Sequence, residues 1–150
     1  MTRPPRRVVT GHTADGHSTI VSDGPAPSRI DLDGIAINEQ WIIDSSPPPL
    51  DELVNRSDER DFSLEPLPGG IKCSLVRLES GLPPSRSRMH ETSTLDFVVV
   101  VSGEITLLME DGETTLYPGD SVIERGTNHA WANRGSGPRV IAATMISTRT

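Results

Sequence analysis

The sequence predicts a single all-β domain, built as a sandwich or barrel of short strands. Thirteen glycines and thirteen prolines divide the 150 residues into short pieces. These pieces carry β-branched residues in alternation, and no sustained helical period of about 3.6 residues is present. Since single domains commonly have about 100 to 150 residues, a second domain is not expected.

The first half of the chain predicts fewer and less regular elements. Arg6–Thr10 and Thr19–Ser22 flank the turn-forming run Thr13–Gly16, which predicts a hairpin or two edge strands. A further strand is expected over Ala36–Asp44. The only candidate for a short helix is Leu50–Asp61, which begins with an acidic first turn.

From Gly70 onward the pattern is regular, and each apolar run ends in Gly, Pro, Asp or Asn. Asp111-Gly112 is a strong hairpin-turn signal. Val98–Val101 is apolar at every position, which indicates a central strand packed on both faces. The strands expected here are Ile71–Leu78, Leu95–Val101, Glu104–Met109, Glu113–Leu116, Ser121–Ile123, Ala130–Asn133 and Val140–Ile146.

The regularity of the predicted strands differs between two parts of the chain, which together form one domain. Residues 1–45 are expected to be an N-terminal arm, or edge strands, packing on the barrel or on a partner subunit. Residues 46–150 form the barrel, with its key motifs in 81–133. Because exchanged arms often build symmetric dimers, a homodimer is expected.

Composition excludes several classes of function. The net charge of -7 and pI near 5.0 argue against a nucleic-acid partner, which needs clustered cations. Cys73 is the single cysteine, so no disulfide can form within the chain. No apolar stretch approaches the roughly 18 residues of a membrane span, and no secretory signal is recognised, so a cytoplasmic protein without a membrane partner is expected.

Two of the four histidines lie in the regular β region, at His90 and His129. Side chains alternate along an extended chain, so His90, Thr92 and Asp96 share one face, while His129, Trp131 and Asn133 share another. If both faces point into one barrel, two imidazoles and a carboxylate meet near its mouth, beside a space for one small ligand.

The run over residues 89–96 and the glycine that follows it resemble the first part of the cupin signature. His90 matches its first ligand histidine and Gly103 its closing glycine. Thr92 stands in the place of the second histidine, Asp96 in that of the glutamate, and Pro84 in that of the leading glycine.

The second part of the signature resembles Tyr117–Asp120 followed by Arg125–His129. His129 matches the third ligand histidine and Asn133 the final asparagine, whereas Glu124 replaces the usual proline. The resemblance covers roughly a third of the chain and implies a double-stranded β-helix, the jelly-roll barrel of the cupins.

The resemblance also implies a divalent transition metal (Fe, Mn, Ni or Zn), with His90, Asp96 and His129 as its ligands. The departures from the motif leave a metal-free pocket as an alternative, because Asp is one carbon shorter than Glu and Thr92 is a weak ligand. In that case a histidine acts as acid and base with Asp96 orienting it.

Three functions follow for the pocket. The first is a lyase or isomerase that dehydrates, decarboxylates or shifts a double bond in a small oxygenated metabolite, aromatic compounds included. Its catalytic residues are His90, His129 and Asp96. The second is a metal-dependent dioxygenase, and the third a non-catalytic small-molecule binding module. The expected substrate-binding residues are Thr92, Trp131, Arg125 and Asn133. Each of the last three has an alternative role: Trp131 is either a binding wall or part of the core, and Arg125 is either a carboxylate clamp or a solvated charge. Asn133 either contacts the ligand or fixes the turn or the barrel end by hydrogen bonds.

Overall fold

The computed structural model describes residues 5–26, 28–32, 34–48, 55, 61–81 and 88–149, and this part of the chain is built from strands without any α-helix. The helix expected over 50–61 lies almost wholly outside the described residues. The strands are β1 (Arg6–His12), β2 (Ser18–Pro25), β3 (Ser28–Leu32), β4 (Ile35–Ile43), β5 (Ile71–Leu78), β6 (Thr94–Ser102), β7 (Ile105–Met109), β8 (Glu113–Leu116), β9 (Ser121–Arg125), β10 (His129–Ala132) and β11 (Arg139–Ser147).

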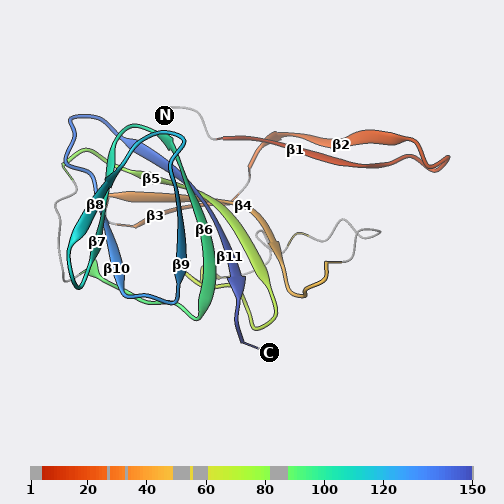
Figure 1. The fold of residues 1–150 in the computed structure, drawn as a ribbon. Helices are drawn as coiled ribbons and strands as arrows, with labels where there is room; N and C mark the ends of the chain where they lie inside the picture. The colour runs from red at the N-terminus through yellow and green to blue at the C-terminus, as the bar shows by residue number, and fades with distance from the viewer. Residues whose placement is uncertain are drawn as a thin grey trace.

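The strands form two sheets and a separate hairpin. The larger sheet has the order β3-β4-β5-β11-β6-β9, and the smaller has the order β10-β7-β8. All pairings are antiparallel. The smaller sheet faces the larger one and the two enclose a jelly-roll barrel (Figure 1). The predicted all-β barrel is therefore confirmed.

The barrel strands follow the alternation of the sequence. Gly112 has a φ of 96°, a conformation that glycine adopts at little cost, and the Met109 N–H donates to its carbonyl across the β7–β8 turn. The Asp111-Gly112 signal thus produces the hairpin it predicts. Along β6, Val98 and Val100 point inward and are buried.

The core lies between the two sheets. Its members are 1–3% exposed: Leu78, Val98, Val100, Ile105 and Ile141. At about 25 cal/mol per Å2, burial of side chains of this size contributes roughly 1.5–3 kcal/mol each. This cluster is the apolar interior on which the strands of both sheets pack.

The expectation that Val98–Val101 packs on both faces is wrong for the outer face. The strand β6 is internal to the sheet, between β11 and β9, as expected. However, Val101 is 50% exposed and Phe97 is 48% exposed. Within the described residues no second layer covers this side of the large sheet.

The residues expected to form an arm divide into two structures. The strands β3 and β4 join the edge of the large sheet, whereas β1 and β2 form a hairpin that projects away from the barrel (Figure 1). At its base, the Arg7 guanidinium donates to the Gln40 carbonyl at 3.1 Å and lies over the Trp41 ring. No helix among the described residues is long and apolar enough to cross a membrane.

Candidate functional site

Two histidines meet at the open end of the barrel because their backbones pair. The N–H of His90 donates to the carbonyl of His129, and the N–H of His129 donates to that of His90, both at 2.9 Å. This bridge places the two imidazole rings side by side, with their centroids 4.6 Å apart. The two segments of the cupin-like motif are thereby brought together, as the alternation predicts.

Each of these imidazoles is oriented by a carbonyl two residues before it. Nδ1 of His90 lies 3.1 Å from the Arg88 oxygen, and Nδ1 of His129 lies 2.8 Å from the Thr127 oxygen. A carbonyl can only accept, so in the neutral rings the proton is on Nδ1. Nε2 of both rings is then left with its lone pair as an acceptor.

Two carboxyl groups accompany the histidines. Asp96 on β6 and Glu124 on β9 are direct partners in the antiparallel register, and each is only 5% exposed. Oδ1 of Asp96 and Oε1 of Glu124 are buried without a hydrogen-bond partner among the described residues. Since buried polar atoms are nearly always paired, these two oxygens are available to a bound molecule.

Burial makes both carboxyl groups weaker acids than usual. Desolvation, followed by the nearby charge of Asp96, raises the pKa of Glu124 to about 8. Desolvation also raises the pKa of Asp96, against the opposing effects of a Thr94 hydrogen bond and of His90. Near neutral pH Glu124 is therefore largely protonated.

Glu124 and His129 form a direct pair. Oε2 of Glu124 lies 3.3 Å from Nε2 of His129, and both side chains are buried. Desolvation lowers the pKa of His129, partly opposed by its bond to the Thr127 backbone. The neutral Glu124 hydroxyl then donates to the neutral imidazole, and one proton can move between the two groups.

A cavity of about 180 Å3 adjoins these four groups. Its polar lining is His90, Thr92, Asp96, Glu124 and His129. The rest is apolar and includes Ile37, Val76, Leu78, Val98, Ile141 and Met145. Such a cavity accepts a small, mainly apolar molecule with one or two oxygens.

Two of the expected substrate-binding residues line this cavity. Thr92 is buried, and its hydroxyl lies 2.7 Å from that of Thr94. Trp131 forms part of the wall and meets the His129 ring edge-on, with centroids 6.2 Å apart. Arg125 lies elsewhere, in a groove on the other side of Glu124.

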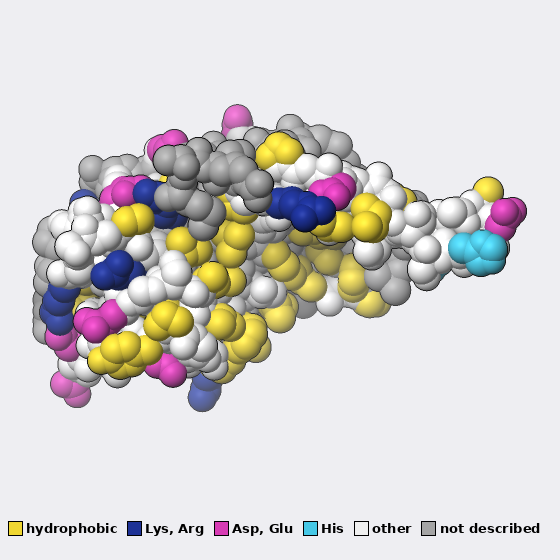
Figure 2. Space-filling model, turned by 90° about the horizontal axis from the view of Figure 1, so that it is seen from above, with side chains coloured by type: hydrophobic (Ala, Val, Ile, Leu, Met, Phe, Trp, Pro, Cys, Tyr) yellow, Lys and Arg dark blue, Asp and Glu magenta, His cyan; other side chains and the backbone are white. Residues whose placement is uncertain are grey.

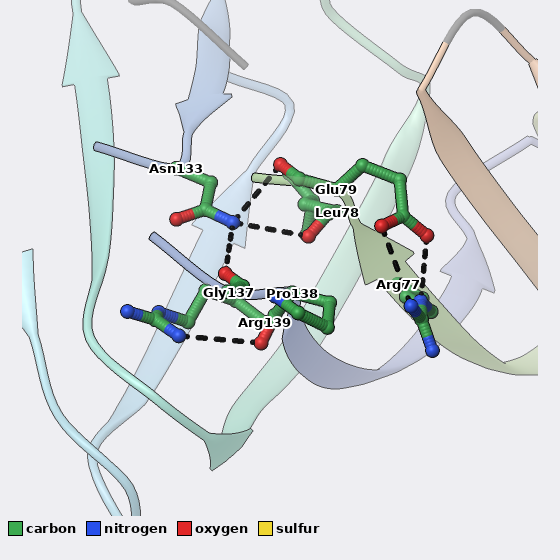
Figure 3. A network of polar contacts seen from close by, with 7 residues as sticks. All are labelled: Arg77, Leu78, Glu79, Asn133, Gly137, Pro138 and Arg139. Atoms are coloured by element: carbon green, nitrogen blue, oxygen red, sulfur yellow. Dashed lines mark hydrogen bonds and ion pairs between the residues drawn. The ribbon is translucent and has the colours of Figure 1, made fainter. Parts of the chain in front are cut away.

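Asn133 is not among the residues that line the cavity, and its contacts agree with the other role expected for it, which is to fix a turn by hydrogen bonds. Its amide donates to the carbonyls of Leu78, Glu79 and Gly137 at 3.1, 2.9 and 2.9 Å (Figure 3). Its Oδ1 accepts from the N–H of Gly135. With 0% exposure, Asn133 joins the turn after β10 to the end of β5.

Glu124 is the site residue that sequence reasoning did not identify. The predicted strand ended at Ile123, whereas β9 continues to Arg125. With that extension, the alternation that turns Val122 inward also turns Glu124 inward, opposite Asp96. The sequence did contain a sign of this, because Glu124 lies two residues after Val122 and so shares its inward face.

The donor types suit the metal that the motif implies, but their placement does not form a site. Two imidazole nitrogens and a carboxylate are ligands for Fe, Mn, Ni or Zn. Among the residues that the structure describes, however, no three His, Cys, Asp or Glu side chains are placed to hold one metal ion. His90, Asp96 and His129 share the cavity without forming a metal centre, so the residues as placed do not fit the group.

Comparison with known proteins identifies the family. Residues 74–145 match the family model described as the Cupin domain. The chain is 34% identical over 140 residues to the Phomopsin biosynthesis cluster protein D of Diaporthe leptostromiformis, covering 88% of this chain and 72% of that protein. The chain therefore belongs to the cupin superfamily.

Other similar proteins carry different descriptions. A cupin-domain-containing oxidoreductase, srdB of Neurospora crassa, is 31% identical, with 87% of this chain and 67% of that protein covered. A sugar phosphate isomerase structure from Silicibacter pomeroyi superimposes with a TM-score of 0.50 at 22% identity, covering 77% of this chain and 61% of the other. That likeness shows the fold alone.

Proposed function

We propose that this cupin is an acid/base enzyme, a lyase or isomerase acting on a small oxygenated metabolite. The observation that carries this proposal is the buried contact of 3.3 Å between Oε2 of Glu124 and Nε2 of His129 at the cavity. A protonated carboxyl and a neutral imidazole in contact make an acid and a base at the same pH. The apolar walls select a substrate with few polar groups.

The pair supports a balanced proton transfer. In a dehydration, Glu124 donates its proton to the leaving hydroxyl, the C–O bond breaks and water departs. As Glu124 gives up its proton, its hydrogen bond to Nε2 of His129 is lost. Nε2 of His90, or the Nε2 of His129 freed in this way, accepts the proton from the neighbouring carbon, and the C–H electrons form the double bond. In a double-bond shift the same groups remove a proton at one carbon and deliver one at another.

The catalytic roles differ in one respect from those expected from the sequence. His90 and His129 keep their acid/base role, but Glu124 takes the place of Asp96 as the carboxyl partner of His129. The chief effect of Asp96 is electrostatic, because its charge helps to keep the proton on Glu124. Asp96 is thus a positioning residue in this proposal.

An oxidoreductase is the second candidate. Relatives described as cupin-domain-containing oxidoreductases support it, as do the two imidazoles that line the cavity. It requires donors that the described side chains do not bring to one point. Metal dependence of turnover separates it from the first candidate.

The test measures solvent-proton exchange. Chelator-treated protein is incubated in D2O with a panel of small ketones and β-hydroxycarbonyl compounds, and deuterium uptake is followed by NMR. Loss of a general acid/base residue commonly costs about 100-fold or more, so Glu124→Gln is expected to slow uptake by at least that factor. Glu104→Gln, which changes an exposed carboxylate, is the matched control.

The result depends on which variant loses activity. Uptake that is fast in the wild type and in Glu104→Gln but lost in Glu124→Gln supports the proposal. Uptake or oxygen consumption that appears only with added Fe(II) or Mn(II) favours the oxidoreductase. Uptake that is unchanged in Glu124→Gln contradicts the role of the Glu124–His129 pair.

A further inference from the structure

A second hollow, the β9 groove, opens on the far side of Glu124. It has a volume of about 310 Å3 and is lined by Leu107, Met109, Thr127 and four consecutive residues of β9, Val122–Arg125. Consecutive strand residues point to opposite faces, so a hollow that touches all four runs along the edge of the strand. Within the described part of the chain that edge is free, because β9 ends the large sheet and pairs there only with β6.

Among the residues that the structure describes, Arg125 is the one cation that lines this groove, and its side chain makes no hydrogen bond or ion pair with them. Every other Lys or Arg side chain that the structure describes has a polar or aromatic partner, as in the pairs Arg134–Glu113 and Lys72–Glu39. Arg125 has no such partner among the described residues. In a chain with net charge -7, an unpaired guanidinium beside a hollow is a specific place for an anion.

Glu124 links this groove to the cavity, since it is the one residue that lines both. Its Oε2 contacts His129, while its buried Oε1 has no partner within the described structure. Because this oxygen is buried and unpaired where the two hollows meet, it can form a hydrogen bond with a molecule that occupies them. The cavity alone, at about 180 Å3, is smaller than the roughly 300–1,000 Å3 of ordinary ligand sites.

We propose that the substrate is an apolar organic acid whose carboxylate binds Arg125 in the β9 groove and whose reacting part lies beside Glu124 and His129. Leu107, Met109 and Ile123 provide the apolar wall for the chain that joins the two ends. The guanidinium holds the carboxylate by charge-assisted hydrogen bonds. This inference rests on the proposed function for the reacting end, but the carboxylate site can be tested without turnover.

Methionine methyl groups report which hollow is occupied. Met109 lines the β9 groove, Met145 lines the cavity, and Met89 packs elsewhere against the core. In protein labelled with 13C at the methionine methyls, the signals are assigned with Met109→Leu and Met145→Leu. The probes are butyrate, hexanoate and octanoate, with hexanamide as the uncharged match to hexanoate.

Hexanoate is expected to shift the Met109 signal and to leave Met89 unchanged. Affinity should rise about fourfold for each methylene that the groove buries. Arg125→Gln should weaken hexanoate about tenfold and bring it level with hexanamide, because the charge-assisted contact is lost. Arg134→Gln, which removes an exposed guanidinium bound to Glu113, should leave hexanoate affinity unchanged.

Other outcomes overturn the proposal. Shifts confined to Met145, equal affinity for hexanoate and hexanamide, or no loss in Arg125→Gln would each show that Arg125 does not hold a carboxylate here. The absence of any shift up to tens of millimolar would do the same, as would a groove that takes an extended peptide along β9 but no acid. If hexanoate does not bind while deuterium uptake still depends on Glu124, the groove proposal is wrong and the proposed function stands. If hexanoate binds through Arg125 but no deuterium uptake is seen, the groove proposal stands and the proposed function is wrong.

Discussion

The two faces of β6 differ sharply although both are rich in apolar residues. Asp96, Val98 and Val100 on the inner face are 2–5% exposed, whereas Phe97 and Val101 on the outer face are 48% and 50% exposed. The inner face packs in the core and lines the cavity, whereas the side chains of the outer face are exposed or half-buried. The comparison shows that an apolar sequence predicts a surface that is buried somewhere. It does not tell whether the same chain or another molecule covers that surface.

We propose that a second copy of this chain covers the outer face, which makes the expected homodimer. Leu95 and Ile146 lie on the same face as Phe97 and are also exposed. The β1–β2 hairpin carries exposed Ile20, and an isolated hairpin is at best marginally stable in water. Figure 2 shows hydrophobic side chains gathered on the flank of the barrel that leads toward the hairpin, which suits a reciprocal contact.

The largest effect is expected from one substitution made on each face of β6. Val100→Asp places a charge without a partner among buried core residues and should cost more than about 4 kcal/mol, enough to prevent folding. Val101→Asp, one position along, should cost less than about 1 kcal/mol because its side chain is half exposed. Urea unfolding of both variants checks this, and equal losses would contradict the assignment of the faces.

The buried ion pair between Lys72 on β5 and Glu39 on β4 is expected to need both of its charges. Lys72 Nζ lies 2.6 Å from Oε1 of Glu39, and these side chains are 2% and 5% exposed. Lys72→Met leaves the carboxylate buried without its cation and should cost about 3–5 kcal/mol. The double variant Lys72→Met with Glu39→Leu should recover most of that loss in thermal unfolding; a double variant as unstable as the single one would refute the pairing argument.

The pH dependence of stability tests the inner carboxyl groups. Glu124 has its pKa raised from 4.5 to about 8 in the folded state, so the folded state binds more protons than the unfolded state between these values. Its contribution to stability is complete below pH 4.5 and is lost as pH rises through about 8, at no more than about 1.4 kcal/mol per pH unit. The difference between wild type and Glu124→Gln in urea unfolding at several pH values isolates this slope from that of His129.

The smallest effect on stability is expected from the outer face. Phe97→Ser should change the free energy of unfolding of the monomer by less than about 1 kcal/mol, because the ring is already half exposed. It should nevertheless weaken association, since large apolar side chains dominate such contacts. Light scattering after size exclusion measures this, with Tyr117→Ser as a control at an exposed position outside the face; a wild-type monomer at high concentration would rule out the dimer.

Much of the barrel was predictable because its turns are marked locally. Ile71–Leu78 and Glu113–Leu116 agree with β5 and β8 at both ends. A glycine precedes each strand, and a proline follows two residues after the second. The β1–β2 hairpin was likewise predicted from its turn. The strand β3 was not, because Ser28–Leu32 is too short and too polar to show a period.

The site was predictable where it depends on alternation and not where it depends on distant contacts. His90, Asp96 and His129 were placed at one cavity from their phase along extended segments. The hydrogen-bonding role of Asn133 was among the roles expected for it, but its partners at Leu78 and Glu79 could not be named, because they lie more than fifty residues away in sequence. Glu124 required the true end of β9, and a strand end is the least certain feature of a pattern.

The bridge between His90 and His129 is made by main-chain atoms alone. Any residue other than proline keeps an N–H and a carbonyl at these positions, so the bridge does not require the imidazoles. The barrel therefore separates the framework that presents two side chains to the cavity from the choice of those side chains. Exchanging the residues at positions 90 and 129 should alter the chemistry of the pocket while leaving its scaffold in place.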